Sequence, residues 1–398
     1  MQVIVVGAGF AGLAAADALA REGVSVDVLE ARDRVGGRVW SVPFAGAVVE
    51  RGAEFILPHD KTVIAFADRL GLRVARKGTR YGNREPRGGD RPVTHREVAA
   101  ALRRIGSEPR PAGDGTLAGA LGAYGLEPGV AEAIQARIEV SCAYSADDLD
   151  PDALTEGAAS FGDFETFTVE GGNDRIARAL ASGLGEAVRY SAPVTRVGWS
   201  AGGVRVIAGG REWVADAAVI AVPATVLDAI AFDPALPPGK TSVRYGQAAK
   251  LFVGLRTPSP PSEVLSVPER YWCYTQLGPD GHPAPFAAAF AGSPRALETL
   301  EVASGPERWL AALGRLRPDL DLDLGTVMLS TWTDDPWAQG AYSARSATLP
   351  LDSVALAQPV RPLFFAGEHT AGAWHGLMEG ALRSGARAAG EVLQTVPR

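Results

Sequence analysis

The chain has 398 residues, and 46% of them are hydrophobic, which is enough for a full core and excludes disorder as the default state. Its 39 Lys and Arg against 46 Asp and Glu give a net charge of −7, so the basic excess that nucleic-acid binding draws on is missing. The two cysteines, Cys142 and Cys273, form no CxxC pair and the five histidines show no ligand spacing, so we expect no metal site.

The N-terminal residues predict a βαβ unit. The chain enters the apolar run 3–6 almost at once, without the basic and hydrophobic regions of a signal peptide. No window approaches 18 uninterrupted apolar residues, so we expect a cytoplasmic chain with no membrane contact. The run 3–6 predicts a strand, 7–12 a glycine-rich turn, the alanine-rich stretch to Glu22 a helix, and 24–29 a second strand.

Downstream, two segments interrupt the pattern of strands and helices that is typical of a nucleotide-binding domain, and the pattern resumes after each of them. The Arg-, Gly- and Pro-rich stretch 73–110 precedes two helical patterns, and together they predict an inserted helical lobe. Short strands with Gly-Gly turns resume over 188–222, and a second departure spans 241–328. The predicted elements are helices at 116–124, 128–143 and 306–316 and a last one through 393, strands at 194–197, 204–207, 217–222, 250–255 and 363–366, and a Pro-rich loop at 258–268.

This order predicts an α/β fold with two interleaved domains. A Rossmann-type domain that binds a dinucleotide would be built from residues 1–75, 166–240 and 325–398. A smaller substrate-binding domain, made of a mixed sheet plus the helical lobe, would take residues 76–165 and 241–324.

A dinucleotide-binding fingerprint lies between the first predicted strand and the first predicted helix. Gly7, Gly9 and Gly12 fit GxGxxG, whose glycines allow a tight turn, backbone approach to a pyrophosphate and close helix packing. Glu30 ends the second predicted strand, at the distance where a carboxylate holds the ribose hydroxyls. Because strand, turn and helix all occur in the required order, a dinucleotide site is favoured over a simple helix cap.

The residues from Glu30 onward indicate which dinucleotide binds. Glu30-Ala31-Arg32-Asp33-Arg34-Val35-Gly36-Gly37-Arg38 resembles the ExxxxxGGR extension of the flavin amine oxidase superfamily, which implies FAD and makes the Rossmann-type domain an FAD-binding domain. Similar segments extend over nearly the whole chain, at 50–55, 170–173, Val194, 220–223, 332–342, 365–370 and 374–381. By this resemblance the cofactor-binding residues are Gly7, Gly9, Ala11, Gly12, Glu30, Ala31, Arg32, Gly36, Gly37, Arg38, Gly52, Ala53, Glu54, Val194, Trp332, Gly367, Glu368, Gly376, Leu377 and Met378.

The resemblance also implies how FAD is held. Gly367 and Glu368 would contact the pyrophosphate and the ribityl chain. Met378 would begin a helix whose N–H groups face flavin N1 and O2, because a helix N-terminus favours the negative charge of the reduced ring. Ala341 takes the position where covalent members carry the flavin-linked cysteine, so FAD should be non-covalent.

Five residues are expected nearest the chemistry, and the first four are Lys250, Tyr342, Trp332 and Leu377. Lys250 matches the lysine that holds a water against flavin N5, and we expect an electrostatic task for it, since burying a lysine without one is costly. Tyr342 and Trp332 resemble an aromatic wall that attracts the substrate amine by cation–π contact. The second wall falls at Leu377, so the two-aromatic cage of typical monoamine oxidases is incomplete.

Glu54 is the fifth residue, an unusual charge in the flavin-facing segment. Its carboxylate could bind a substrate ammonium, or it could be solvated or salt-bridged, and the sequence leaves both open. Phe55 and Ile56 stand where amino-acid oxidases of this superfamily carry an arginine for the substrate carboxylate. We therefore expect an amine without a carboxylate beside the reacting carbon.

The implied activity is FAD-dependent oxidation of a small-molecule amine to an imine, by hydride transfer to flavin N5 and reoxidation by O2 to hydrogen peroxide. The alternatives are a C–C desaturase or porphyrinogen-type oxidase, an L-amino-acid oxidase, and a catalytically eroded flavin-binding interaction module. Lys250 argues against a desaturase. The sequence leaves the substrate, the physiological acceptor and the oligomeric state open, a homodimer included.

Overall fold

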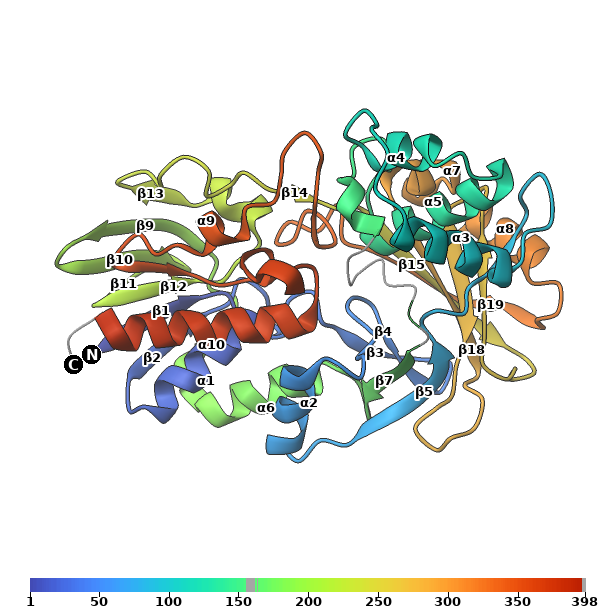
Figure 1. Cartoon of the computed structure of the whole chain (residues 1–398). Coiled ribbons are helices and arrows are strands. Elements are labelled where there is room, and N and C mark those ends of the chain that lie inside the picture. Colours follow the sequence, from blue (N-terminus) through green and yellow to red (C-terminus); the bar gives the residue numbers. More distant parts are fainter. Residues whose placement is uncertain (155–161, 163, 396–398) are drawn as a thin grey trace.

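A five-stranded parallel sheet forms the centre of one half of the molecule in the computed structural model, which describes residues 1–154, 162 and 164–395 (Figure 1). The first strand of the chain lies in the middle and the last at one edge, so segments far apart in the sequence build one sheet. The strand order is β21-β12-β1-β2-β8, with β1 (Gln2–Val6), β2 (Ser25–Leu29), β8 (Val188–Arg189), β12 (Ala217–Ile220) and β21 (Leu363–Phe365).

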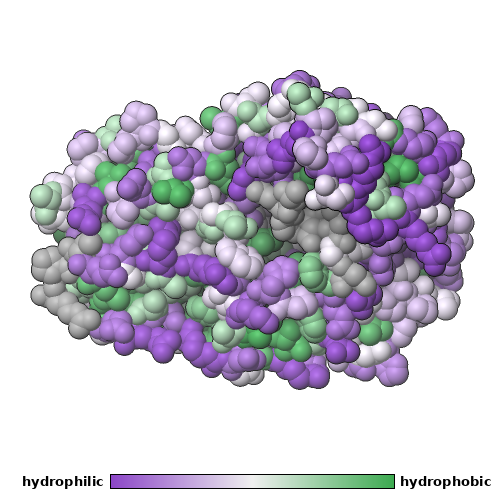
Figure 2. Space-filling view, viewed as in Figure 1, coloured by the Kyte–Doolittle hydropathy of each residue, from purple (hydrophilic) through white to green (hydrophobic). Residues whose placement is uncertain are grey.

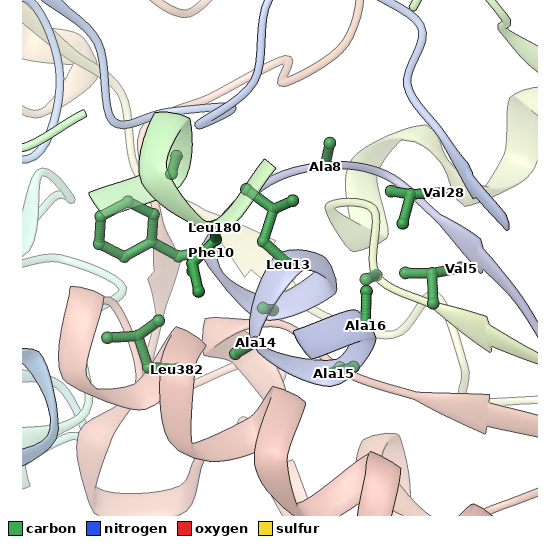
Figure 3. Packing of buried hydrophobic residues seen from close by; sticks show 14 of the residues in the cluster. Val5, Ala8, Phe10, Leu13, Ala14, Ala15, Ala16, Val28, Leu180 and Leu382 are labelled. Carbon is green, nitrogen blue, oxygen red and sulfur yellow. The ribbon is translucent and has the colours of Figure 1, made fainter. Parts of the chain in front are cut away.

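Helices α1 and α10 pack tightly together on one face of this sheet. An added Cβ at Gly385 of α10 would lie 2.1 Å from the Ala11 carbonyl oxygen of α1, so small residues are required where the two backbones meet. Figure 3 shows Leu13 and the alanines of α1 beside Leu180 of α6 and Leu382 of α10. The helices of this layer are α1 (Phe10–Arg21), α2 (Lys61–Arg69), α6 (Arg175–Leu184) and α10 (Met378–Thr395).

An antiparallel sheet covers the other face of the parallel sheet. Side chains alternate along β1, so Val3 and Val5 face the helices while Ile4 and Val6 pack against Val206 of the second sheet. Its strand order is β11-β10-β9-β13, with β9 (Val194–Ser200), β10 (Gly203–Ala208), β11 (Arg211–Ala215) and β13 (Ala231–Asp233).

The other half of the molecule is built on a six-stranded sheet with helices on both faces (Figure 1). All eight residues of β15 are buried; Phe252 faces the layer of α3, α4 and α5, while Leu251 and Val253 face α7 and α8. The order is β19-β15-β18-β17-β16-β6, with β6 (Glu85–Arg87), β15 (Ala248–Leu255), β16 (Ser262–Ser266), β17 (Tyr271–Thr275), β18 (Phe286–Gly292) and β19 (Leu322–Thr331). The helices are α3 (His95–Ser107), α4 (Leu117–Ala123), α5 (Pro128–Cys142), α7 (Pro294–Thr299) and α8 (Glu307–Leu316).

Three short strand pairs and one short helix complete the described strands and α-helices. The pairs join segments between the two halves, and β5 with β7 brings residues 74–80 beside 165–169. They are β3 (Ser41–Phe44) with β4 (Ala47–Glu50), β5 (Val74–Arg80) with β7 (Glu165–Val169), and β14 (Arg244–Tyr245) with β20 (Ser343–Ala344), and the helix is α9 (Ser353–Ala357).

The predicted α/β fold class and the predicted elements are confirmed, with two local corrections. The stretch 73–110, predicted without elements, contains β5, β6 and α3, and α3 begins with a capping box between Thr94 and Glu97 that was present in the sequence. The predicted loop 258–268 contains β16, because strand pairing with β17 outweighs the prolines around it. The predicted range 76–165 includes positions 155–161 and 163, which lie outside the described residues.

The molecular surface is mainly polar on the face seen in Figure 2, where hydrophobic residues form separate small groups. Among the described residues, no helix is both long and apolar enough to cross a bilayer.

Candidate active site

A cavity of about 500 Å³ lies at the carboxyl edge of the parallel sheet and reaches into the other half of the molecule. Residues within the first two positions after β1, β2, β12 and β21 line it, which is where ligands bind in open parallel sheets. Of the residues predicted to bind the cofactor, all line this cavity except Gly12. We call the part of the wall after these four strands the cofactor end.

The glycine turn 7–12 has the backbone that its motif predicts. Gly7 has a positive φ of 100°, and an added Cβ at Gly12 would lie 1.9 Å from the Gly7 carbonyl oxygen, so Gly12 serves helix packing behind the turn. At Gly9 an added Cβ would meet nothing within 4 Å, since this glycine borders the cavity. Gly9 also caps α1 without a side-chain hydrogen bond, which leaves the helix N-terminus able to bind an anion.

Glu30 holds the turn in place as well as facing the cavity. Its carboxylate accepts hydrogen bonds from the Ala8 N–H at 2.7 Å and the Arg32 N–H at 2.9 Å. Burial raises the pKa of Glu30, and the two N–H donors offset part of that rise. The Arg32 guanidinium makes a bidentate ion pair with Asp335, at 2.5 and 2.8 Å, which fixes the 332–342 segment beside β2.

Glu368 connects the remaining parts of the cofactor end. It binds the Arg38 guanidinium at 3.0 Å, the Ser343 hydroxyl at 2.5 Å and the Gly376 N–H at 2.7 Å. Burial alone would raise the pKa of Glu368, but the charge of Arg38 and the hydrogen bonds from Ser343 and Gly376 together outweigh burial and hold the pKa at about 2. An ionised Glu368 therefore holds together segments that begin and end this wall.

The cofactor end fits an FAD molecule. The open side of Gly9 and the uncapped N-terminus of α1 suit a pyrophosphate, and the N-terminal residues of α10, Leu377 and Met378, line the same cavity and suit the electron-rich edge of a flavin. Ala341 also lines the cavity and offers no thiol for a covalent link. The residue types and their placement agree with the resemblance found in the sequence.

A buried cluster of charges lies where β4, β5, β15 and β17 meet. Glu54 accepts hydrogen bonds from Lys77 Nζ at 2.7 Å, Lys250 Nζ at 2.5 Å and the Tyr274 hydroxyl at 2.5 Å. Lys250 Nζ also donates to the Glu50 carbonyl oxygen at 2.9 Å. We call Glu54, Lys77, Lys250 and Tyr274 the Glu54 cluster; each of the four is buried.

Opposite charges set the ionisation of this cluster. Burial alone would raise the pKa of Glu54, but Lys250 and Lys77 outweigh it and lower the pKa to about 2. Burial lowers the pKa of Lys250, and Glu54 offsets only part of that effect. Of the two roles that the sequence leaves open for Glu54, this geometry disfavours binding of a substrate ammonium, because both carboxylate oxygens already accept hydrogen bonds from protein donors. The salt-bridged alternative holds.

Aromatic rings surround the rest of the cavity, which we call the aromatic end. The predicted Tyr342, Trp332 and Leu377 line the cavity, and Tyr342 donates to the Ser141 carbonyl oxygen at 2.7 Å. The sequence analysis missed Trp272 and Tyr274, which stack with their centroids 4.3 Å apart. Their spacing of two residues on one strand was a usable signal, since it places both rings on the same face. Phe55, Tyr81 and Phe290 also line this end.

Two charged residues of this region were missed as well. Lys77 follows two arginines and precedes Gly78 on β5, and nothing in that stretch distinguishes it from a surface lysine. Arg84 lines the cavity although it comes from the Arg-rich stretch 73–110, where one arginine cannot be told from another by pattern alone. Among the described residues, no group of His, Cys, Asp and Glu is arranged to hold a metal ion.

Comparison with known proteins identifies the family. A family model described as flavin containing amine oxidoreductase matches residues 10–105 and 101–393. The chain belongs to this family. Its cofactor is therefore FAD, and its reaction is the oxidation of an amine donor.

Individual relatives match over almost the whole chain. A putative flavin-containing monoamine oxidase of Mycobacterium tuberculosis is 28% identical over 98% of this chain and 96% of its own length. The putrescine oxidase of Kocuria rosea is 28% identical over 98% of this chain and 95% of its own. Among solved structures, a putrescine oxidase covers 99% of both chains with a TM-score of 0.83 at 24% identity. The cyclohexylamine oxidase of Brevibacterium oxydans gives the same TM-score at 22% identity, so both share the fold.

Proposed function

We propose that this protein oxidises the neutral form of a small amine to an imine and uses O2 as the final electron acceptor. When bound, FAD would accept a hydride from the carbon next to the amine at N5 and pass the electrons on to O2, giving hydrogen peroxide. The observation that carries the proposal is a buried lysine, Lys250, in the wall of a cavity that has a dinucleotide turn at one end and aromatic rings at the other.

The charge of the Glu54 cluster favours a neutral amine. Lys77 and Lys250 carry two positive charges against one on Glu54, so the cluster repels an ammonium group bound nearby. Repulsion of the charged form lowers the pKa of a bound amine, and the lone pair that assists hydride departure becomes available. The aromatic faces of Tyr342 and Tyr274 can then orient the substrate without an ion pair.

Lys250 is suited to assist the reaction with O2. Two of its three N–H donors bind Glu50 and Glu54, which fixes the ammonium and leaves one donor unassigned by protein contacts. A fixed cation in a buried site stabilises negative charge as it forms on oxygen, and such a preorganised contact is commonly worth on the order of a hundredfold in rate.

The test of this role is Lys250→Met. We expect anaerobic reduction by substrate to continue while reoxidation by O2 slows about a hundredfold, because the thioether cannot stabilise the developing charge. Lys77 still pairs with Glu54 in this variant, so the fold should persist. Lys77→Met is the matched control, since it removes the same charge from the same carboxylate at a position that does not line the cavity.

Stopped-flow absorbance of the flavin measures both half-reactions separately. Slow reduction with normal reoxidation in Lys250→Met would contradict the assigned role, and so would an equal loss of reoxidation in both variants. The activity itself is tested by an anaerobic screen of amines for bleaching of the bound flavin, followed by admission of air and measurement of hydrogen peroxide. A protein that bleaches with amines but releases no peroxide would refute O2 as the acceptor.

A further inference from the structure

A buried guanidinium faces the aromatic end without a counter-charge. Arg84 is 3% exposed, lies directly before β6 and lines the cavity. Its Cζ lies 3.9 Å from the ring centroid of Trp272 and 4.6 Å from that of Tyr81. The two rings exclude water from the faces of the guanidinium, so its charge is costly unless an anion reaches its edge.

The hydrogen bonds of Arg84 leave most of its donors unused. Nη1 donates to the Ser141 hydroxyl at 3.0 Å, and Nε has no partner among the described residues. A guanidinium has five N–H donors in a planar fork whose geometry matches a carboxylate. Within the described part of the chain, no carboxylate lies within ion-pair distance of Arg84.

Three other buried arginines have a carboxylate partner. Arg38 pairs with Glu368, Arg270 with Glu139, and Arg317 with Asp319. Arg84 also has a positive neighbour, because burial and then the charge of Arg84 lower the pKa of Arg137. An anion bound to Arg84 would supply the counter-charge that Arg84 lacks among the described residues.

Arg84 lies close to the predicted aromatic wall. Ser141 links the two, since its hydroxyl accepts from Arg84 and its carbonyl oxygen accepts from the Tyr342 hydroxyl. A small molecule that contacts Tyr342 is thus within reach of the guanidinium in the same cavity.

We propose that the substrate amine also carries a carboxylate and that Arg84 binds this carboxylate through the donors that Ser141 leaves free. The inference rests on the proposed amine oxidation and adds the substrate class. It replaces the expectation of an amine without a carboxylate, because Arg84, in the connection between β5 and β6, would take the task of the arginine that is missing at Phe55 and Ile56. Glu54 does not oppose it, since the two lysines bound to Glu54 outnumber its single negative charge.

The first test measures ligand binding to the FAD-loaded protein and does not depend on catalytic turnover. Benzoate and benzamide have nearly the same shape, and only benzoate is charged, so each is titrated while the flavin absorbance spectrum is followed. We expect benzoate to bind at least about tenfold more tightly than benzamide, as a charge-assisted pair with arginine requires. Equal affinity for the two compounds would overturn the proposal without any variant.

The second test assigns the site to Arg84. Arg84→Gln should raise the benzoate dissociation constant about a hundredfold and leave the benzamide dissociation constant nearly unchanged. Arg84→Lys should have a benzoate dissociation constant between those of the wild type and Arg84→Gln, because lysine keeps the charge but lacks the planar fork of donors. Arg87→Gln is the matched control. It removes the same charge from a position three residues along the chain, where the side chain faces solvent and does not line the cavity. An equal loss in Arg84→Gln and Arg87→Gln would contradict a specific site.

Substrate pairs separate this inference from the proposed function. Phenylethylamine is compared with L-phenylalanine, and butylamine with 4-aminobutanoate, by anaerobic flavin reduction in the wild type and in Arg84→Gln. The inference is supported if the carboxylate-bearing compound of either pair has the higher kcat/KM in the wild type and loses this advantage in Arg84→Gln through a raised KM. Which of the two pairs shows the advantage distinguishes an α-carboxylate from a distal carboxylate. Reduction by amines with no gain from a carboxylate in either pair refutes the inference alone. No reduction by any amine, with Arg84-dependent benzoate binding intact, refutes the proposed function alone.

Discussion

The cofactor end and the aromatic end of the cavity are built from different materials. At the cofactor end the wall is mostly backbone, and glycines such as Gly7 and Gly12 are required by conformation or close contact. At the aromatic end the wall is made of side chains, held by buried charges such as Lys77, Glu54 and Lys250. The first kind of wall has little room for added atoms at positions such as Gly12, whereas the second depends on its paired charges, and the predictions below test that difference.

The largest effect is expected at the aromatic end, for Glu54→Gln. The substitution keeps the size of the side chain but leaves two buried ammonium groups without their counter-charge, which should lower the free energy of unfolding by about 4 kcal/mol. Chemical denaturation of the FAD-loaded protein measures the loss. The double variant with Lys77→Met removes one charge of each sign and should recover part of it. A loss below about 1 kcal/mol in Glu54→Gln would show that the ion pairs matter little.

At the cofactor end, a single added methyl group should cost almost as much. Gly12→Ala places a Cβ against the Gly7 carbonyl oxygen, so the turn must move, and we expect a loss of about 3 kcal/mol in unfolding free energy. Gly9→Ala is the control, because its Cβ meets no protein atom and the backbone there is compatible with alanine. Gly9→Ala should therefore keep the fold of the FAD-free protein and weaken FAD binding. Similar stability of both variants would argue against the packing role of Gly12.

The difference between the two ends explains what sequence could predict. Part of the cofactor end is local: Gly7, Gly9, Gly12 and Glu30 lie within one βαβ unit, so spacing alone identified them, whereas the other residues of this wall were identified through the family resemblance. The aromatic end is assembled from β4, β5, β15 and β17, and the partners of Glu54 lie 23, 196 and 220 residues away from it. No periodicity connects such positions. For that reason Lys77 and Arg84 were indistinguishable from surface residues, while Lys250 was found only through the family resemblance.

A pH-dependent stability should trace to Glu50, which adjoins the Glu54 cluster. Burial raises the pKa of Glu50 to about 7, although the Asn173 N–H and the Ser41 hydroxyl donate to it. The unfolded chain releases this proton near pH 4.5 and the folded chain keeps it until about pH 7, so stability falls as pH rises through that window, by about 3 kcal/mol. Denaturation at pH 4.5 and pH 7 measures the fall. Glu50→Gln should remove it, and an unchanged pH dependence in that variant would place the titration elsewhere.

The smallest effect is expected for Glu30, whose side chain holds the backbone of the cofactor end in place. Glu30→Ala leaves the Ala8 and Arg32 N–H groups unpaired and removes the predicted ribose contact, so FAD binding should weaken by about 2 kcal/mol. Isothermal titration of the FAD-free protein gives the affinity. Glu30→Gln keeps acceptor oxygen at one position and should recover part of the loss. Unchanged affinity in Glu30→Ala would move the ribose contact to another residue.

The order in which the cavity walls occur along the chain has a consequence for biosynthesis. The ribosome makes the glycine turn 7–12 first, but the turn is only one side of the cofactor site. Strand β21, Glu368 and the start of α10 complete the wall, and they are made last. A chain that stops before residue 363 lacks an edge strand, the carboxylate that holds Arg38, and the helix that packs on α1. Capture of FAD therefore requires a chain that extends at least through the start of α10.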